Sequence, residues 1–172
     1  MTNSRSPLRL NIGFLINQSV GTSRDFPIEL SNIRFDPDLE LSNLDGTARV
    51  TRIAQGLLVQ AKLQAAQQTE CVRCLTEFEQ ELHADFTELY AFTNKSVTDS
   101  GLLLPEDGHI DLAPLVREYM LLDIPIKPLC STDCKGLCPV CGENLNETQC
   151  GHTTESIDPR LAVLKSLLEN KK

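Results

Sequence analysis

Clustered cysteines constrain this chain more than any other feature. Of its seven cysteines, five lie close together near the C-terminal end: Cys130, Cys134, Cys138, Cys141 and Cys150. The string Cys138-Pro139-Val140-Cys141-Gly142 is typical of a metal-binding knuckle, because its two-residue spacer lets both thiolates face one ion. Gly142 can adopt the positive φ that such a turn requires.

This stretch offers six metal ligands, whereas a structural zinc site uses four. The candidates are Cys130, Cys134, Cys138, Cys141, Cys150 and His152. Cys138 and Cys141 form the firmest pair. On the N-terminal side, spacing leaves Cys130 and Cys134 as alternatives. On the C-terminal side, Cys150 is favoured over His152, because four thiolates make the commonest closed site. A segment with so few large apolar residues would not fold without a bound metal ion that cross-links it.

Iron is the main competitor of zinc for these ligands, since thiolates bind both metals. The spacing Cys134-x3-Cys138-x2-Cys141 also matches a radical-SAM iron–sulfur motif. That chemistry needs a large (β/α) barrel, for which the chain is too short. We therefore expect structural Zn²⁺, with an iron–sulfur cluster less favoured, and visible absorbance would distinguish the two.

A second cysteine pair, Cys71 and Cys74, lies far upstream. Three interpretations remain open for it. The pair could be a structural turn with buried thiols, or half of a second metal site completed by another chain or by spare C-terminal thiols. It could also be a redox dithiol, because Arg73 between the thiols would lower a thiol pKa. It lacks the helix N-terminus that a thioredoxin-like dithiol requires.

We expect a cytoplasmic protein, and nothing in the sequence argues for an enzyme. Residues 1–7 are polar, no apolar signal-peptide core follows them, and no stretch is long enough to span a membrane. A cytosolic protein keeps its cysteines reduced, which favours metal binding over disulfides. The net charge of −8 disfavours indiscriminate binding to nucleic acid. No catalytic motif is recognisable.

Alternating apolar residues predict strands at residues 8–16, 26–30, 46–54 and 57–65. Another long strand is predicted from Leu75 to Phe92, although part of that segment would also fit a helix. Two long strands on either side of a tight turn predict an antiparallel hairpin with Cys71–Cys74 near its tip.

Residues 93–109 are polar and predict a loop. A helix is expected at 111–123, with Asp111 as its N-cap and Pro114 tolerated in its first turn. A second helix is expected to open at Asp158-Pro159. We therefore predict an α+β fold, in which an antiparallel β-sheet that could close toward a barrel precedes two C-terminal helices flanking a small zinc-ribbon-like module. The predicted divisions are a β-rich domain at 1–125, the cysteine-rich module at 126–153 and a C-terminal helix at 154–172.

The order of several motifs resembles the YceD-like family, named for accumulation of large-subunit ribosomal RNA. The matching strings are Glu70-Cys71-Val72-Arg73-Cys74-Leu75, Ile110-Asp111-Leu112, Leu121-Leu122-Asp123-Ile124-Pro125, Cys130, Cys134-Lys135-Gly136-Leu137-Cys138-Pro139-Val140-Cys141-Gly142, Asn144-Leu145-Asn146, Ile157-Asp158-Pro159-Arg160-Leu161 and Leu164. The resemblance covers about residues 8–168. The string from Cys134 to Gly142 is the specific part, and the others support it by their order.

The resemblance implies a non-enzymatic factor in ribosome biogenesis that binds ribosomal RNA or a ribosomal protein. If the C-terminal part folds back, basic residues could form a local patch for RNA or a partner: Arg73, Lys127, Lys135, Arg160 and Lys165. Such a patch would act at short range, because salt screens distant charges within about 10 Å. The alternatives are a protein-interaction scaffold with structural zinc and a Cys-x-x-Cys dithiol redox protein.

Overall fold

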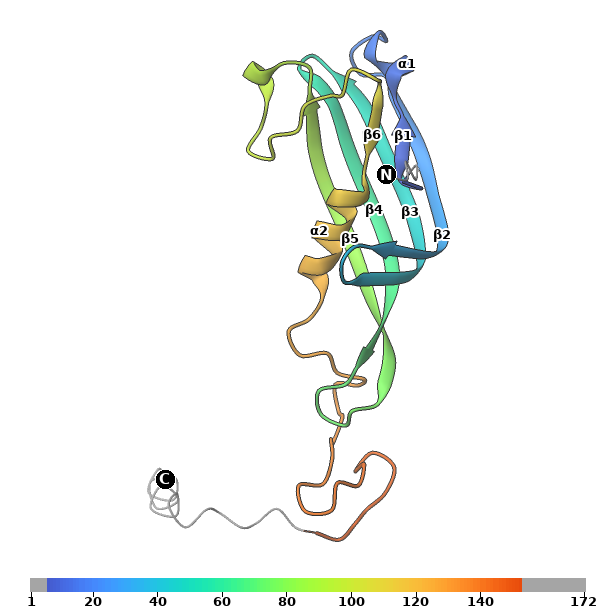
Figure 1. Ribbon diagram of the computed structural model, residues 1–172, viewed down its shortest axis with the longest axis vertical. Coiled ribbons are helices and arrows are strands. Elements are labelled where there is room, and N and C mark those ends of the chain that lie inside the picture. The colour runs from blue at the N-terminus through green and yellow to red at the C-terminus, as the bar shows by residue number, and fades with distance from the viewer. Residues whose placement is uncertain (1–5, 153–172) are drawn as a thin grey trace, which may run out of the picture.

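A long four-stranded antiparallel sheet forms the body of the protein (Figure 1). The computed structural model describes residues 6–152. The strands lie in the order β2, β3, β4, β5, with bounds Ser23–Phe35, Leu39–Ile53, Gly56–Glu70 and Glu77–Ala91. The described strands form an open sheet with edges at β2 and β5, so the prediction of closure toward a barrel is wrong. An open sheet must cover its apolar face with other elements.

Short elements cover one face of this sheet (Figure 1). They are β1 at Arg9–Asn11, α1 at Gly13–Ile16, the 3₁₀ turn η1 at Asn94–Ser96, β6 at His109–Asp111 and α2 at Ala113–Asp123. β1 and β6 pair as a separate two-stranded ribbon. Buried side chains of α1, β6 and α2 join those of the sheet in one aliphatic core, whereas η1 buries no residue. No helix among residues 6–152 is long and apolar enough to cross a membrane.

The hairpin of β4 and β5 confirms the prediction from alternating residues. In β4 the side chains that alternate into the core are Leu57, Val59, Ala61, Leu63 and Ala65. β4 and β5 stay in register from Gly56↔Ala91 to Glu70↔Glu77. The helical alternative for the second segment is therefore wrong, and Cys71–Cys74 lies at the tip of the hairpin, as predicted. Alternation of this kind is expected where one sheet face is buried and the other is wet.

The predicted strand at residues 8–16 is wrong beyond its first few residues. β1 ends at Asn11, and the chain then makes one helical turn. Leu8 and Ile12 are buried as alternation predicts, but Leu15 is buried in place of Phe14, which is 51% exposed. The change of period from two to about four residues follows from the turn at α1.

The helix α2 confirms the prediction for residues 111–123 with a shifted start. Asp111 ends β6, and Leu112 is the N-cap residue, so Asp111 is not the cap. Its carboxylate still accepts a hydrogen bond from the Ala113 N–H at 3.0 Å. At the other end, Asp123 accepts a 2.7 Å hydrogen bond from the His83 N–H and so covers part of the β5 edge.

Gly46 marks a position where the sheet tolerates no side chain. A Cβ there would lie 2.1 Å from the Lys62 carbonyl oxygen, and φ is +146°. Gly46→Ala is expected to lower the free energy of unfolding by about 2–5 kcal/mol, because backbone of the paired strand must move. Gly101→Ala is the matched control, since Gly101 has φ of +69° and open space around it, and should cost about 1–2 kcal/mol. Urea unfolding measures both, and equal losses would contradict the prediction.

After α2 the chain leaves the sheet and runs to the tip of the β4–β5 hairpin, where it forms the cysteine-rich end (Figure 1). Among residues 124–152 there is no helix and only an isolated bridge between Leu137 and Asn144. The predicted helix opening at Asp158-Pro159 lies outside the described residues, as do Arg160 and Lys165.

Candidate metal centres

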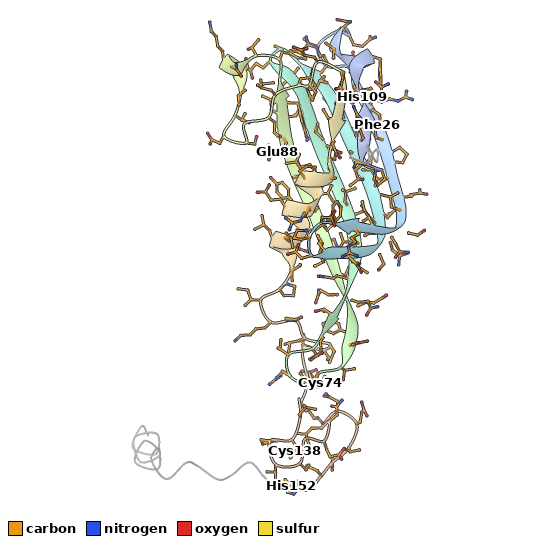
Figure 2. The ribbon with its side chains drawn as sticks, viewed as in Figure 1. Phe26, Cys74, Glu88, His109, Cys138 and His152 are labelled. Carbon is orange, nitrogen blue, oxygen red and sulfur yellow. The ribbon has the colours of Figure 1, made fainter. Side chains whose placement is uncertain are left out.

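All seven cysteines and one histidine gather into two groups at this end of the molecule. The first cluster consists of Cys71, Cys74, Cys130 and Cys134, and the second of Cys138, Cys141, Cys150 and His152. Within each cluster the four ligand atoms all lie within 4.8 Å of one another. Figure 2 shows Cys74 at the end of the hairpin and Cys138 with His152 beyond it.

Both clusters have the dimensions of a site for a single tetrahedral ion. Zinc–sulfur bonds of about 2.3 Å imply a sulfur–sulfur edge of about 3.8 Å. In the first cluster, Sγ–Sγ distances are 3.8 Å from Cys71 to Cys134 and 3.5 Å from Cys74 to Cys130. In the second, Cys138 Sγ lies 3.8 Å from His152 Nδ1. A multi-iron cluster would hold at least some of its four thiolates farther apart than this, because its thiolates bind more than one iron.

Each cluster begins with a knuckle, and the two knuckles have the same backbone hydrogen bonds. Leu75 N–H donates to the Cys71 carbonyl at 2.9 Å, and Gly142 N–H donates to the Cys138 carbonyl at 2.8 Å. The residue after the second cysteine has positive φ in both, +59° at Leu75 and +77° at Gly142. The pair Cys71/Cys74 is therefore built like a metal-binding turn, and no helix follows it as a redox dithiol would need.

Backbone contacts attach the C-terminal segment to the first knuckle. Val72 N–H donates to the Pro128 carbonyl, and Leu137 N–H donates to the Arg73 carbonyl, both at 3.0 Å. Gly136 lies so close to the knuckle that a Cβ there would be 3.0 Å from the Arg73 oxygen, and its φ is +79°. These contacts bring Cys130 and Cys134 to the hairpin tip.

Backbone N–H groups make one thiol in each cluster unusually acidic. The N–H of Cys130, with those of Cys74 and Arg73, lowers the pKa of Cys71 to about 6. The N–H groups of Cys141 and Val140 do the same for Cys138, whose pKa is also about 6. The neighbouring Cys74 thiol, followed by burial, raises the pKa of Cys130 to about 12. Four convergent thiols thus ionise together only where a cation neutralises their charge.

Very little apolar surface supports these clusters. Cys71, Cys74 and Cys134 are buried, and within residues 6–152 only three partly buried hydrophobic residues pack against them: Phe78, Leu129 and Leu137. The aliphatic core of the sheet is a separate cluster. Two side chains of the first knuckle point outward, since Val72 is 51% and Leu75 56% exposed. Among the described residues, this end therefore has little apolar core of its own.

The structure divides the ligand atoms into two groups, whereas the sequence favoured one C-terminal site and left a second site at Cys71 and Cys74 open. Cys130 and Cys134 both lie with the upstream pair rather than with Cys138 and Cys141. His152 lies beside Cys150 instead of replacing it. This grouping agrees with one alternative left open by the sequence, in which Cys71 and Cys74 form half of a second site completed by spare C-terminal thiols. The similarity of the two turns is not evident from the sequence, because Leu75 stands where the other knuckle has Gly142.

Three of the predicted contact residues surround the first cluster. Arg73 belongs to its knuckle, Lys127 precedes the Pro128 contact, and Lys135 follows Cys134; all three are exposed. Within residues 6–152 none of the three forms an ion pair. The structure thus brings Arg73, Lys127 and Lys135 to the same end of the molecule.

Comparison with known proteins gives a family match across this end of the chain. A family model described as "Large ribosomal RNA subunit accumulation protein YceD" matches residues 59–168, more than half of the chain. That range includes most of the β4–β5 hairpin, α2 and both clusters. No solved structure matches the chain significantly.

Curated relatives agree with this match. An uncharacterized protein of Mycobacterium tuberculosis is 37% identical over 130 residues, which cover 73% of this chain and 62% of the relative. The YlbN protein of Bacillus subtilis is 31% identical over 101 residues, which cover 58% of this chain and 59% of the relative. A chloroplastic large ribosomal RNA subunit accumulation protein YCED homolog of Arabidopsis thaliana is 37% identical over 65 residues, 38% of this chain and 20% of the relative. The chain thus belongs to the YceD family of large ribosomal RNA subunit accumulation proteins.

Proposed function

We propose that this chain is a non-catalytic factor in the accumulation of large-subunit ribosomal RNA, and that it binds RNA with its zinc-organised end. Membership of the YceD family supports a ribosome-related role. The observation that carries the finer proposal is the assembly of two single-ion clusters at one end of the molecule, beside exposed basic residues. The proposal places the protein in the cytoplasm, where thiols stay reduced.

Zinc is the metal proposed for both clusters. Its four-coordinate chemistry with thiolate and imidazole ligands fits ligand sets of four cysteines and of three cysteines with one histidine. All seven cysteines are free in the structure, which leaves every sulfur available as a ligand. The role proposed for the ions is structural, because four protein ligands fill all the positions of a tetrahedral ion and leave none for a substrate.

RNA contact is proposed for the basic residues around the first cluster. Arg73, Lys127 and Lys135 are exposed, and their charges are not used in ion pairs among the described residues. Exposed, unpaired lysine and arginine side chains can neutralise phosphates and release counterions. Arg160 and Lys165 are included in the proposed contact set on the sequence alone.

A ribosomal protein is the second candidate partner, because one face of β5 is acidic. Alternation places Glu77, Glu79, Glu81 and Asp85 in one exposed row along this strand. Such a row attracts a basic partner and repels RNA, so it favours a ribosomal protein at this face. Under this alternative the protein is an interaction scaffold whose zinc ions only hold its shape.

Filter binding to ribosomal RNA at several salt concentrations tests the proposal. Arg73→Gln and Lys135→Gln are each expected to weaken binding and to reduce the slope of log K against log salt by about 1, because each removes one phosphate contact. Lys62→Gln is the matched control, since Lys62 pairs with Asp85 on the sheet. A flat salt dependence in the wild-type protein would exclude phosphate contacts. Retention of ribosomal proteins on the wild-type chain, lost on neutralising the acidic row, would then support the second candidate.

A further inference from the structure

The loop at residues 142–149 belongs to one cluster but contacts the other. It lies between Cys141 and Cys150, two ligands of the second cluster, so an ion there would fix both of its ends. Yet two asparagines of this loop, Asn144 and Asn146, direct their side chains to the first cluster and its surroundings. The loop therefore connects the two centres physically.

Asn146 contacts the first cluster directly. Its Nδ2 donates to Cys134 Sγ at 3.4 Å, and its Oδ1 accepts the Lys135 N–H at 2.8 Å. Asn144 Oδ1 accepts from both the N–H and the Nδ2 of Asn146, at 3.0 and 2.8 Å, which fixes the orientation of this amide. An N–H donor to a ligand sulfur stabilises the negative thiolate and orients it, as outer-shell partners do in metal sites.

A second chain of contacts reaches another ligand of the first cluster. Asn144 Nδ2 lies 3.4 Å from Thr76 Oγ1, and Thr76 Oγ1 lies 3.4 Å from Cys74 Sγ. The backbone continues the connection, since Leu145 N–H donates to the Gly136 carbonyl at 2.9 Å. The loop thus supports Cys134 directly and Cys74 through the Thr76 hydroxyl.

We propose that the two clusters bind their ions cooperatively, with Asn146 as the positioning residue that couples them. This inference rests on the proposed zinc binding. An ion in the second cluster orders the 142–149 loop, and the ordered loop holds Asn146 against Cys134 without a further loss of entropy. Loss of an outer-shell partner weakens metal binding by about 10- to 100-fold. By linkage, an ion in the first cluster strengthens the second centre by the same factor.

Anaerobic titration of the reduced full chain with Co²⁺, in competition with a chelator, tests the coupling. Thiolate-to-cobalt charge-transfer absorption distinguishes the clusters, because its intensity rises with the number of thiolate ligands. Disabling the second cluster with Cys150→Ser and His152→Ala is expected to weaken Co²⁺ binding at the first by about 10-fold or more. Disabling the first cluster with Cys71→Ser and Cys74→Ser should weaken the second by the same factor.

Substitutions of Asn146 identify the residue responsible. In Asn146→Ala the first cluster should bind Co²⁺ about 10-fold more weakly, and disabling the second cluster should then weaken it little further. Asn146→Asp keeps an acceptor for Lys135 but puts a negative oxygen beside Cys134, so it should weaken binding at least as much. Gln149→Ala is the matched control from the same loop and should keep the wild-type coupling.

The outcomes separate the coupling from the zinc proposal. If both clusters bind Co²⁺ and disabling either leaves the other unchanged, the coupling is excluded while the two sites stand. Coupling that persists in full in Asn146→Ala would exclude the assigned role of this residue. No thiolate–cobalt absorption in the wild-type chain would exclude both the coupling and the proposed metal sites. Circular dichroism of the sheet confirms that each variant is folded.

Discussion

Cys74→Ser protein is expected to bind one zinc ion per chain, whereas wild-type protein is expected to bind two, one in each of the two ligand clusters. Structural zinc sites have apparent binding free energies of about 10–16 kcal/mol, so an equal share for each of four ligands is roughly 3 kcal/mol. Loss of one thiolate should therefore raise the dissociation constant of that site by roughly 100-fold. Elemental analysis after gel filtration through a chelator of intermediate affinity measures the remaining ion.

Cys141→Ser is the matched comparison, because it removes one thiolate from the second cluster. It should also leave one ion, and Co²⁺ substitution should give the absorption of a four-thiolate site. In Cys74→Ser the remaining site should instead show three thiolates and one histidine. His83→Ala should keep both ions, since His83 lies on the sheet and outside both clusters. A complete loss of metal in either cysteine variant, with no Co²⁺ binding even at high Co²⁺ concentration, would show that the ligands serve one shared site.

Removal of both ions is expected to unfold the cysteine-rich end while the sheet stays folded. Residues 126–152 have little apolar packing of their own, whereas the sheet and α2 share a large aliphatic core that includes no cysteine. Binding free energy of a structural zinc ion is folding free energy for a segment of this kind. Hydrogen exchange in the chelated protein should therefore become fast in 126–152 and stay slow in the β4 and β5 cores.

Readdition of zinc should restore slow exchange, which controls for damage to the thiols during chelation. Far-UV circular dichroism should keep its strand signal throughout. Cooperative loss of protection in β4 and β5 would mean that the ions stabilise the whole chain. Protection that persists in 126–152 without metal would mean that side-chain packing alone holds this end, which would remove the structural role proposed for zinc.

Local patterns predicted the elements near the clusters well. Alternation in β4 marked its buried face, and the position of Cys71–Cys74 between two strand-like segments marked the hairpin tip. Helical spacing and prolines marked α2. These predictions succeeded because each depends on residues within one element. The failure at residues 8–16 has the opposite cause, since Leu15 is buried by contacts with distant elements that change the local period.

Ligand pairing was less accessible to sequence reasoning, because it joins residues far apart in the chain. Cys71 and Cys134 are 63 positions apart, and their sulfurs lie 3.8 Å from each other. The chain returns to the hairpin tip only because α2 packs on β5 and points the following segment toward it, with Phe86 and Tyr119 stacked 4.7 Å apart. The spacing of residues 130–152 favoured a site made only from ligands close together in the sequence. It carried no information about the approach of this segment to the hairpin tip.

By itself, the sequence determined the family, the one-sided antiparallel hairpin and the chemistry of the ligands, because residue type and short spacing set these properties locally. The tertiary structure alone decided that the sheet stays open and which four residues form each of the two clusters. It also decided that Asn144 and Asn146, from the loop between two ligands of the second cluster, lie against the first cluster. The physical reason is that ligand grouping is a matter of distance in space, and those distances exist only after the helix has folded back along the sheet and returned the chain to the hairpin tip.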